Sequence, residues 1–361
     1  MSKKNSSVLV AMSGGVDSSA TAKILAEQGF DCIGANMRLY ELHDPAANVK
    51  SCCSLSDADQ AAAVCARMHI PFYVLDCRHD FEKEVILRFV EEYRAGRTPN
   101  PCIDCNRHLK FSTLLTHADQ LNCHYLATGH YARIRFNEES KRYELLKGVD
   151  ASRDQSYVLY MLTQEQLSRT LFPLGELHKT DVRGLAKAGG LLNADKPDSQ
   201  DICFVPDGDY ATFIEEQDGI VSIPGHFIDE SGHVLGTHKG YIHYTIGQRK
   251  GLGISSTEPY FVTEIRTDTN EIVLGRKKDV MSNTLTADRF NWLSISKPEH
   301  NSLRCKAKIR YRYQEADCEV FVTGDDSVKV IFDEPQSAIT KGQAIVLYDE
   351  DRVLGGGTIT S

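Results

Sequence analysis

Short runs of apolar and β-branched residues alternate with longer amphipathic stretches up to about residue 203. The expected strands are Val8–Met12, Cys32–Met37, Phe72–Asp76 and Tyr125–Thr128. Between them, Ser18–Gln28 carries apolar residues at helical spacing and stops at Gly29, and an alanine-rich helix is expected from Ser56 to about His69. Strands that alternate with helices predict βαβ units and a parallel sheet.

The pattern changes after Cys203 to short runs punctuated by glycine and proline. The strand candidates there are Ile220–Ile228, His233–Leu235, Phe261–Ile265 and Ile272–Leu274. From about Ser282 nearly every segment has strand character, namely Cys305–Tyr313, Asp317–Thr323, Ser327–Phe332, Ala344–Tyr348 and Val353–Thr358. Closely spaced strands with turn signals predict a small β-barrel. We therefore expect an α/β domain over 1–205, a small central β-rich domain over 206–280 and a C-terminal β-barrel over 281–361.

Composition narrows the class of protein. With 361 residues, 41% hydrophobic and 25% charged, the chain is typical of globular proteins. Its apolar runs fall far short of the roughly 18 residues that suggest a membrane span. The amino terminus has a polar lead without a secretory signal, so we expect a cytoplasmic protein with no membrane partner.

Charge and cysteine content add two constraints. The 50 acidic residues outnumber the 41 basic residues, which gives a net charge of −9, so any surface for a nucleic acid must be local. Eleven cysteines without an export signal favour reduced thiols over a disulfide scaffold.

The segment Ser13-Gly14-Gly15-Val16-Asp17-Ser18-Ser19 lies between an expected strand and an expected helix. Its glycines let the backbone approach an anion, and the following N–H groups and hydroxyls at a helix start suit phosphate. It lacks the lysine of a Walker A motif and does not fit the dinucleotide fingerprint. The simpler alternative is a glycine turn that caps a helix. The segment resembles the pyrophosphatase loop of α/β enzymes that split ATP into AMP and pyrophosphate.

Two cysteine sites differ from the other cysteines in their surroundings. Cys102 and Cys105 lie in Thr98–Asn106, and Cys203 lies in Asp198–Phe204. These neighbours are polar and loop-forming, which favours an accessible thiolate. A closed zinc site needs four ligands, and one C-x-x-C pair does not supply them. Cys52 and Cys53 stay unassigned.

Nearly the whole chain resembles one family, the bacterial tRNA-specific 2-thiouridylases, which thiolate the wobble uridine. Besides the Ser13–Ser19 loop, the matching motifs are Thr98–Pro101 with Cys105-Asn106, Leu126–Arg133, Arg153–Tyr157, Gln200–Phe204, Tyr244–Gly253 and Lys308–Arg312. The resemblance implies ATP-dependent adenylation of the uracil 2-carbonyl oxygen, followed by sulfur transfer from a cysteine persulfide. The implied products are 2-thiouridine, AMP and pyrophosphate.

The resemblance also assigns residues. ATP would contact Ala11, Met12, Ser13, Gly14, Gly15, Val16, Asp17, Ser18, Met37 and Gly129. Cys203 would carry the persulfide, and Cys105 would act as a nucleophile or release the sulfur by forming a disulfide with Cys203. Mg²⁺ would accompany the triphosphate, with Asp17 as the nearest candidate to place it. The sulfur would come from a cysteine desulfurase or a sulfur-relay protein.

Two departures from the family pattern are present. Cys102 stands where many members have Asp, so Cys102, Cys105 and Cys203 present three thiolates that could ligate a [4Fe–4S] cluster as an alternative sulfur route. Arg153 stands where Lys is usual, which keeps the charge but changes the hydrogen-bond geometry.

The expected tRNA contacts fall in separate segments. They are Asn100, Pro101, Cys102, His130, Arg153, Asp154, Gln155, Lys308, Arg310, Tyr311 and Gln343. Cations recur at every second position from Arg304 to Arg312, which on a strand puts them on one face. Such a stripe favours phosphate contact, and a solvated barrel face is the alternative. A target base in an anticodon loop must also be flipped into the catalytic pocket.

Two other classes of protein remain open from the residues alone. A small-molecule ligase would share the Ser13–Ser19 loop but would have no use for Cys105 and Cys203. A tRNA-binding protein without catalytic activity would not need the phosphate loop.

Overall fold

The computed structural model describes residues 6–40, 55–191, 193–194, 196, 202–205, 208–219, 221–299 and 302–361. Cys52, Cys53 and Gln200, singled out from the sequence, lie outside these residues. The amino-terminal part is built on a five-stranded parallel sheet with the order β3-β2-β1-β4-β7. Its strands are β1 (Ser7–Ala11), β2 (Asp31–Arg38), β3 (Phe72–Asp76), β4 (Tyr125–Ala127) and β7 (Thr170–Leu171).

The helices of this part follow the predicted alternation. They are α1 (Val16–Glu27), α2 (Leu55–Arg67), α3 (Arg78–Phe81), α4 (Leu87–Arg94), α5 (Pro101–Asp104), α6 (Leu114–Gln120), α7 (Gln164–Ser168) and α8 (Lys179–Ala188). The central strand β1 is covered on both faces, since Val8, Leu9 and Val10 have no exposed surface. This is why β1 consists of consecutive apolar residues instead of alternating ones.

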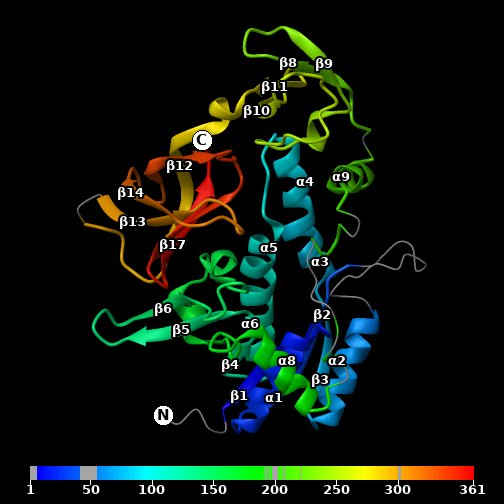
Figure 1. Cartoon of the computed structure of the whole chain (residues 1–361). Coiled ribbons are helices and arrows are strands. Elements are labelled where there is room, and N and C mark those ends of the chain that lie inside the picture. Colours follow the sequence, from blue (N-terminus) through cyan, green and yellow to red (C-terminus); the bar gives the residue numbers. More distant parts are fainter. Residues whose placement is uncertain are drawn as a thin grey trace.

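Helices α4, α5 and α6 form a column that runs from the parallel sheet toward the central domain, beside the barrel (Figure 1). The helical path is continuous from Arg78 to Arg94 and from Pro101 to Gln120, through π-helical turns at Glu82–Ile86 and Cys105–Thr113. Because π-helical turns are frequent at functional sites, the one that begins at Cys105 marks the column for closer attention.

The central part begins with α9 (Tyr210–Asp218) and contains a four-stranded sheet with the order β10-β11-β8-β9. These strands are β8 (Gly225–Ile228), β9 (Val234–His238), β10 (Phe261–Arg266) and β11 (Glu271–Gly275). The Tyr241 hydroxyl donates to the Arg94 carbonyl oxygen (2.9 Å), so the central sheet rests on the end of α4.

The carboxy-terminal part is the predicted β-barrel. Its strands, in sheet order, are β12 (Met281–Trp292), β15 (Val328–Ser337), β14 (Ala316–Val322), β13 (Ser302–Lys308), β16 (Ala344–Asp349) and β17 (Arg352–Ile359). Pairing of β12 with β17 closes the barrel. The fold class predicted from the sequence, a parallel-sheet domain followed by a central β-rich domain and a β-barrel, is confirmed.

Two details differ from the sequence-based prediction. The hairpin β5 (Ala132–Asn137) and β6 (Arg142–Lys147) was not predicted, and it extends the barrel sheet because β6 pairs with β17. The strand expected over Cys305–Tyr313 ends at Lys308, and the following residues form a turn. Cys305, Ala307, Ile309 and Tyr311 were expected on the apolar side of that strand, and of these Ala307 and Ile309 are buried, Cys305 is half-buried and Tyr311 is exposed.

Candidate functional site

The residues expected to bind ATP gather at the carboxyl edge of the parallel sheet. Ser13–Gly15 follows β1, Met37 lies near the end of β2, and Gly129 lies just after β4. Ligands of open α/β sheets bind at this edge, in the crevice outside the strand ends. The topology alone therefore brings segments about 115 residues apart into one place.

Close backbone packing explains the glycines of the loop. Gly14 has φ +73°, and a Cβ atom there would lie 2.4 Å from the Asp57 carbonyl oxygen. A Cβ atom at Gly129 would lie 3.1 Å from the Ser18 backbone nitrogen. Side chains at either position would push the loop away from its neighbours, so both glycines serve the close approach of backbone to backbone.

The hydroxyls of the loop hold its shape. Ser18 Oγ donates to the Gly15 carbonyl oxygen (3.0 Å) and accepts from the Ser13 backbone nitrogen (3.2 Å). Ser19 Oγ also donates to the Gly15 carbonyl oxygen (3.1 Å). The loop leads directly into α1, whose first-turn N–H groups form the positive end of a twelve-residue helix. This arrangement suits a phosphate group.

Two lysines that were not predicted from the sequence also lie around the Ser13–Asp17 loop. Lys179 Nζ lies 2.8 and 2.7 Å from the two carboxylate oxygens of Asp17, and Lys196 pairs with Asp57. Lys179 is the first residue of α8, where a cation opposes the helix dipole. Asp150 offsets this unfavourable position by accepting from the Lys179 backbone nitrogen (3.0 Å). The position of Lys179 at the helix start was not recognised from the sequence, where the bounds of this helix were not predicted.

Asp17 is shared between two donors in this structure. Besides Lys179, the Tyr131 hydroxyl donates to Asp17 Oδ1 (2.8 Å). Oxygen atoms also lie close to the loop, including the Asn193 Oδ1 atom, which is buried and has no hydrogen-bond partner. Hard oxygen donors are the ligand set that Mg²⁺ prefers, so the residues present fit such an ion.

The structure brings Cys105 and Cys203 into one apolar cluster. Cys105 is buried at the start of the π-helical turn, and Cys203 is half-buried and packs against the same group of side chains. That cluster includes Phe81, Phe89 and Phe204, with Phe204 edge-on to both other rings. The Tyr40 hydroxyl donates to the Cys203 carbonyl oxygen. Residues 98 positions apart in sequence thus meet beside the carboxyl end of β2.

Cys102 is exposed and faces a different neighbourhood. It lies one helical turn before Cys105, with its backbone nitrogen donating to the Asn100 side chain that caps α5 (3.2 Å). Burial raises the pKa of Tyr311, and Asp154 and Cys102 nearby raise it further. Within the described ranges no three His, Cys, Asp or Glu side chains converge as metal ligands.

The segments expected to meet tRNA converge around α5. Tyr311 donates to the Asp154 carbonyl oxygen (3.1 Å), and Gln343 Nε2 donates to the carbonyl oxygens of Thr98 (2.8 Å) and Pro99 (3.3 Å). Two turns of the barrel therefore flank the loop that carries Asn100, Pro101 and Cys102.

Three further residues expected to contact tRNA, Asp154, Gln155 and His130, also use their side chains internally. The Asp154 carboxylate accepts from Gly148 and Ser156, and Gln155 Oε1 accepts from the Tyr131 backbone nitrogen (3.0 Å). His130 is buried and packs against the rings of Phe111 and Phe172. Burial lowers the pKa of His130 well below its usual value, and nearby Lys110 adds to this. These three side chains therefore support the site from inside the protein. Arg153, in contrast, is half-buried.

The predicted basic stripe is wrong as a single face of uncompensated cations. Arg304 and Lys306 lie directly opposite Glu319 and Asp317 on β14, and Arg304 also forms a two-point salt bridge with Asp333 (2.8 and 2.7 Å). The sequence from Arg304 to Arg312 does not show these acidic residues, because they belong to neighbouring strands.

Arg310 lies beyond the end of β13, and its guanidinium forms hydrogen bonds within the protein. It donates to the carbonyl oxygens of Ile246 (3.3 Å) and Ala338 (2.8 Å) and to Thr340 Oγ1 (2.7 Å). Since Ile246 belongs to the central domain, Arg310 ties that domain to the barrel. Lys308, half-buried with its Nζ 6.0 Å from the centre of the Tyr348 ring, and exposed Arg312 are the remaining members of the stripe.

Two cavities lie outside the phosphate loop. One, of about 460 Å³, lies behind α5 between α4 and the barrel and is lined by Asn100, Asp104, Arg88, Arg107 and Arg289 among others. Burial raises the pKa of Asp104 even though these three arginines oppose the shift. The Asp104 carboxyl therefore lies in a poorly solvated position beside these arginines.

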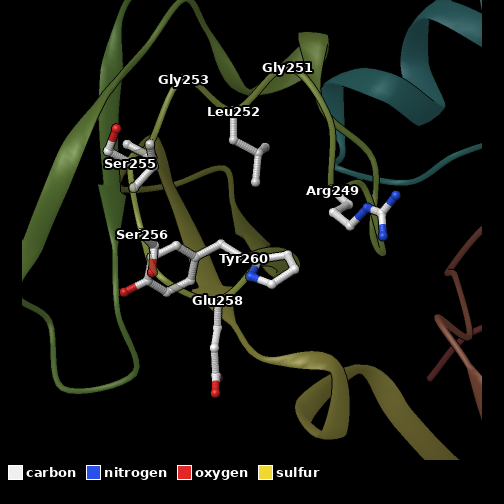
Figure 2. A pocket seen from close by; sticks show the side chains of 10 residues that line it. Arg249, Gly251, Leu252, Gly253, Ser255, Ser256, Glu258 and Tyr260 are labelled. Atoms are coloured by element: carbon white, nitrogen blue, oxygen red, sulfur yellow. The ribbon is translucent and has the colours of Figure 1, made fainter.

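The other cavity, of about 450 Å³, is an open depression in the central domain (Figure 2). It is lined by one segment, Arg249–Tyr260, which includes the end of the Tyr244–Gly253 motif. Arg276 supports it by stacking on the Tyr260 ring at 3.9 Å and donating to the Glu258 carbonyl oxygen (2.6 Å). None of the site residues expected from the sequence lines this depression.

Within the described ranges no helix is long and apolar enough to cross a membrane. Three family models match the chain in order. They describe a tRNA methyl transferase HUP domain over residues 6–207, a tRNA methyl transferase PRC-barrel domain over 212–276 and an aminomethyltransferase β-barrel domain over 282–359.

Curated relatives match over the full length. A tRNA-specific 2-thiouridylase MnmA from Carboxydothermus hydrogenoformans is 50% identical over 98% of this chain and 97% of its own. The protein of the same name from Acetivibrio thermocellus is 50% identical over 99% of this chain and 100% of its own. Among solved structures, the NMN synthetase of Francisella tularensis is 18% identical over 60% of this chain and 78% of its own, with a TM-score of 0.35. By these full-length matches, the chain belongs to the tRNA-specific 2-thiouridylase family.

Proposed function

We propose that this protein uses ATP to convert the wobble uridine of tRNA into 2-thiouridine. The observation that carries the proposal is the location of two kinds of chemistry at the same sheet edge. The Ser13–Asp17 loop with Lys179 suits the phosphates of ATP, and the Cys105–Cys203 cluster lies beside the carboxyl end of β2. A ligase acting on a small molecule has no need for the second feature.

The first step activates a poor leaving group. The uracil 2-carbonyl oxygen attacks the α-phosphorus of ATP, the bond to the β-phosphate oxygen breaks, and pyrophosphate leaves. The N–H groups of the α1 first turn and the Lys179 ammonium stabilise the charge on the departing phosphates. Mg²⁺, held by Asp17 and neighbouring oxygen donors, would supply further neutralisation of the triphosphate.

The second step transfers sulfur from Cys203. The terminal sulfur of its persulfide attacks uracil C2, and AMP leaves with its oxygen. The Cys105 thiolate then attacks Cys203 Sγ, which releases 2-thiouridine and leaves a Cys105–Cys203 disulfide. A thiol reductant returns both cysteines to thiols before the next cycle. The packing of both residues in one apolar cluster supports this pairing.

The persulfide needs an external sulfur source. A cysteine desulfurase or a sulfur-relay protein would deliver a sulfane sulfur to the half-buried Cys203. The more deeply buried Cys105 is less suited to receive sulfur from a second protein, because a donor cysteine must reach the acceptor atom.

The RNA would approach α5 from the side of Tyr311. Asn100, Pro101 and exposed Cys102 form the rim there, and the turns at Tyr311 and Gln343 hold it. Arg153 and Lys308 contribute positive charge near this rim, which helps offset the net charge of −9. A flipped base would pass this rim to reach the cysteines.

The experiment measures pyrophosphate release and 2-thiouridine together. Purified protein is given ATP, Mg²⁺, a persulfide donor and either unmodified tRNA or none. We expect both products only with tRNA, in equal amounts. Pyrophosphate release that is equal with and without tRNA would refute the proposal and favour a small-molecule ligase.

A further inference from the structure

Two cysteines of the barrel face each other across neighbouring strands. Cys305 on β13 is the register partner of Cys318 on β14, and their Sγ atoms lie 3.9 Å apart. Residues directly opposite in an antiparallel pair have neighbouring Cβ atoms, so side-chain rotation together with a small local shift of the strands brings these sulfurs closer. Neither cysteine belongs to a motif that the thiolation chemistry uses.

The pair differs in accessibility. Cys318 has no exposed surface and lies among the core side chains of the barrel, whereas Cys305 is half-buried. Cys318 Sγ also approaches the Cys305 carbonyl oxygen (3.5 Å). A small oxidant would therefore reach Cys305 first, and Cys318 would be the nearest partner for the oxidised sulfur.

The hairpin that the pair would bridge carries the contacts to the catalytic part of the molecule. The turn between β13 and β14 contains Arg310, which donates to the central-domain residue Ile246, and Tyr311, which donates to Asp154. The Cys305–Cys318 pair lies two register pairs before this turn, so a cross-link there constrains the two strands that carry it.

We propose that Cys305 and Cys318 form a reversible disulfide in response to peroxide, and that this disulfide weakens tRNA binding at the hairpin. The Cys305 thiolate attacks one peroxide oxygen, the O–O bond breaks, and hydroxide leaves a sulfenic acid on Cys305. The Cys318 thiol then attacks that sulfur, an S–S bond forms, the S–O bond breaks, and water leaves. The two thiols lose two electrons in total, and peroxide accepts them.

The rate and the consequence follow from the surroundings. The adjacent Cys318 thiol and burial both raise the pKa of Cys305, so its thiolate fraction is small and the reaction is slower than at an exposed thiol. A disulfide needs Cβ atoms about 3.8 Å apart, closer than the usual cross-strand spacing of about 4.5–5.5 Å. The Sγ atoms must also close from 3.9 Å to the S–S bond length of about 2 Å, so the two strands shift locally, and the turn that holds Tyr311 shifts with them.

The first measurement detects the bond itself. The purified protein is treated with hydrogen peroxide, alkylated under denaturing conditions, digested without reduction and analysed by mass spectrometry. We expect a linked pair of peptides containing Cys305 and Cys318, lighter by two hydrogens than the separate peptides and lost after dithiothreitol. Recovery of both cysteines as alkylated thiols, in a sample where Cys102 is oxidised, would overturn the proposal.

The second measurement tests the effect on RNA and rests on the proposed function. Binding of unmodified tRNA is compared before and after peroxide in the parent and in Cys318→Ala, which retains the catalytic cysteines. We expect several-fold weaker binding in the oxidised parent, restored by dithiothreitol, and no such change in the variant.

Cys305→Ser, at a half-buried position, replaces Cys318→Ala if the latter does not fold. An oxidised parent that contains the linked peptide and binds tRNA as tightly as the reduced protein would overturn the coupling to RNA. Failure of the reduced parent to bind tRNA at all would instead count against the proposed function.

Discussion

The Lys179 ammonium lies within hydrogen-bond distance of both carboxylate oxygens of Asp17, at 2.8 and 2.7 Å. The pair joins the first turn of α8 to the first turn of α1, and the Lys179 side chain is only 9% exposed. A buried cation needs a negatively charged partner, and Asp17 is such a partner for Lys179. An incoming phosphate group would give Lys179 a second negatively charged partner.

Replacing Lys179 should separate phosphate binding from folding. We expect Lys179→Ala to lower tRNA-dependent pyrophosphate release roughly a hundredfold, as for loss of a charge-stabilising donor, with partial recovery in Lys179→Arg. Steady-state pyrophosphate assays over a range of ATP concentrations check this. Lys187→Ala, on the same helix but outside the loop, is the control. A Lys179→Ala variant with parental kinetics would remove the lysine from the mechanism.

Asp17→Ala should lower the stability of the protein as well as its rate of pyrophosphate release. It leaves the Lys179 ammonium buried without its carboxylate, for which the expected cost is about 3 kcal/mol. Denaturant unfolding measures this, and the double variant Asp17→Ala, Lys179→Met should recover most of the loss. If the single variant is as stable as the parent, the pair has no structural role.

Cys102 distinguishes a persulfide from an iron–sulfur cluster. The described arrangement does not bring the three cysteines together as ligands, so we expect Cys102→Asp to retain most thiolation activity. Parent and variant are reconstituted with iron and sulfide without oxygen, and visible absorption and thiolation yield are compared. A parent that binds iron and thiolates only when loaded, together with an inactive variant, would establish the cluster route instead.

Lys308 and Lys306 should differ in their contribution to tRNA binding. We expect Lys308→Ala to weaken tRNA binding and lower its salt slope by about one, as for one lost phosphate contact. Lys306→Ala is the matched control, because Lys306 lies opposite Asp317. Equal salt slopes for the Lys308 and Lys306 variants would contradict an RNA contact at Lys308.

The Glu144 side chain links the hairpin of β5 and β6 to the barrel strand β17. Its buried carboxylate accepts from Arg135 (2.6 and 2.9 Å), Asn137 (3.0 Å) and Arg352 on β17 (3.2 Å). Glu144→Ala should cost roughly 2 to 4 kcal/mol, less than a fully buried pair because Arg135 is exposed. Denaturant unfolding checks this, and an unchanged midpoint would contradict it.

The same carboxylate predicts a pH dependence. Burial alone would raise the pKa of Glu144, but the hydrogen bonds from Arg135, Asn137 and Arg352 outweigh it and the pKa is lowered from 4.5. The stability that Glu144 contributes is therefore present above about pH 4.5 and is lost as the pH falls through the lowered value. Glu144→Gln should flatten this part of the stability curve relative to the parent.

The spacing of apolar residues and the positions of turn residues were enough to predict the parallel sheet and the barrel. Strands β1 to β4 agree with their predictions within a residue or two, because each is a short apolar run bounded by turn residues. The hairpin of β5 and β6 was missed because its charged residues, such as Arg135 and Glu144, pair across the two strands and hide the alternation.

The site was predicted less completely. Local motifs showed the phosphate loop and the cysteines, but Lys179 reaches Asp17 only through the packing of α8 on α1. The basic stripe was overestimated for the same reason, since the acids that balance Arg304 come from β14 and β15. Contacts between distant segments are set by the tertiary fold, and no local pattern encodes them.

The most direct test of the account follows two products in one reaction of Cys203→Ser. This substitution removes the proposed sulfur carrier and leaves the Ser13–Asp17 loop and Lys179 intact. With ATP, Mg²⁺, a persulfide donor and unmodified tRNA, the account predicts tRNA-dependent release of pyrophosphate without any 2-thiouridine. Formation of 2-thiouridine by the variant at the parental rate would contradict it.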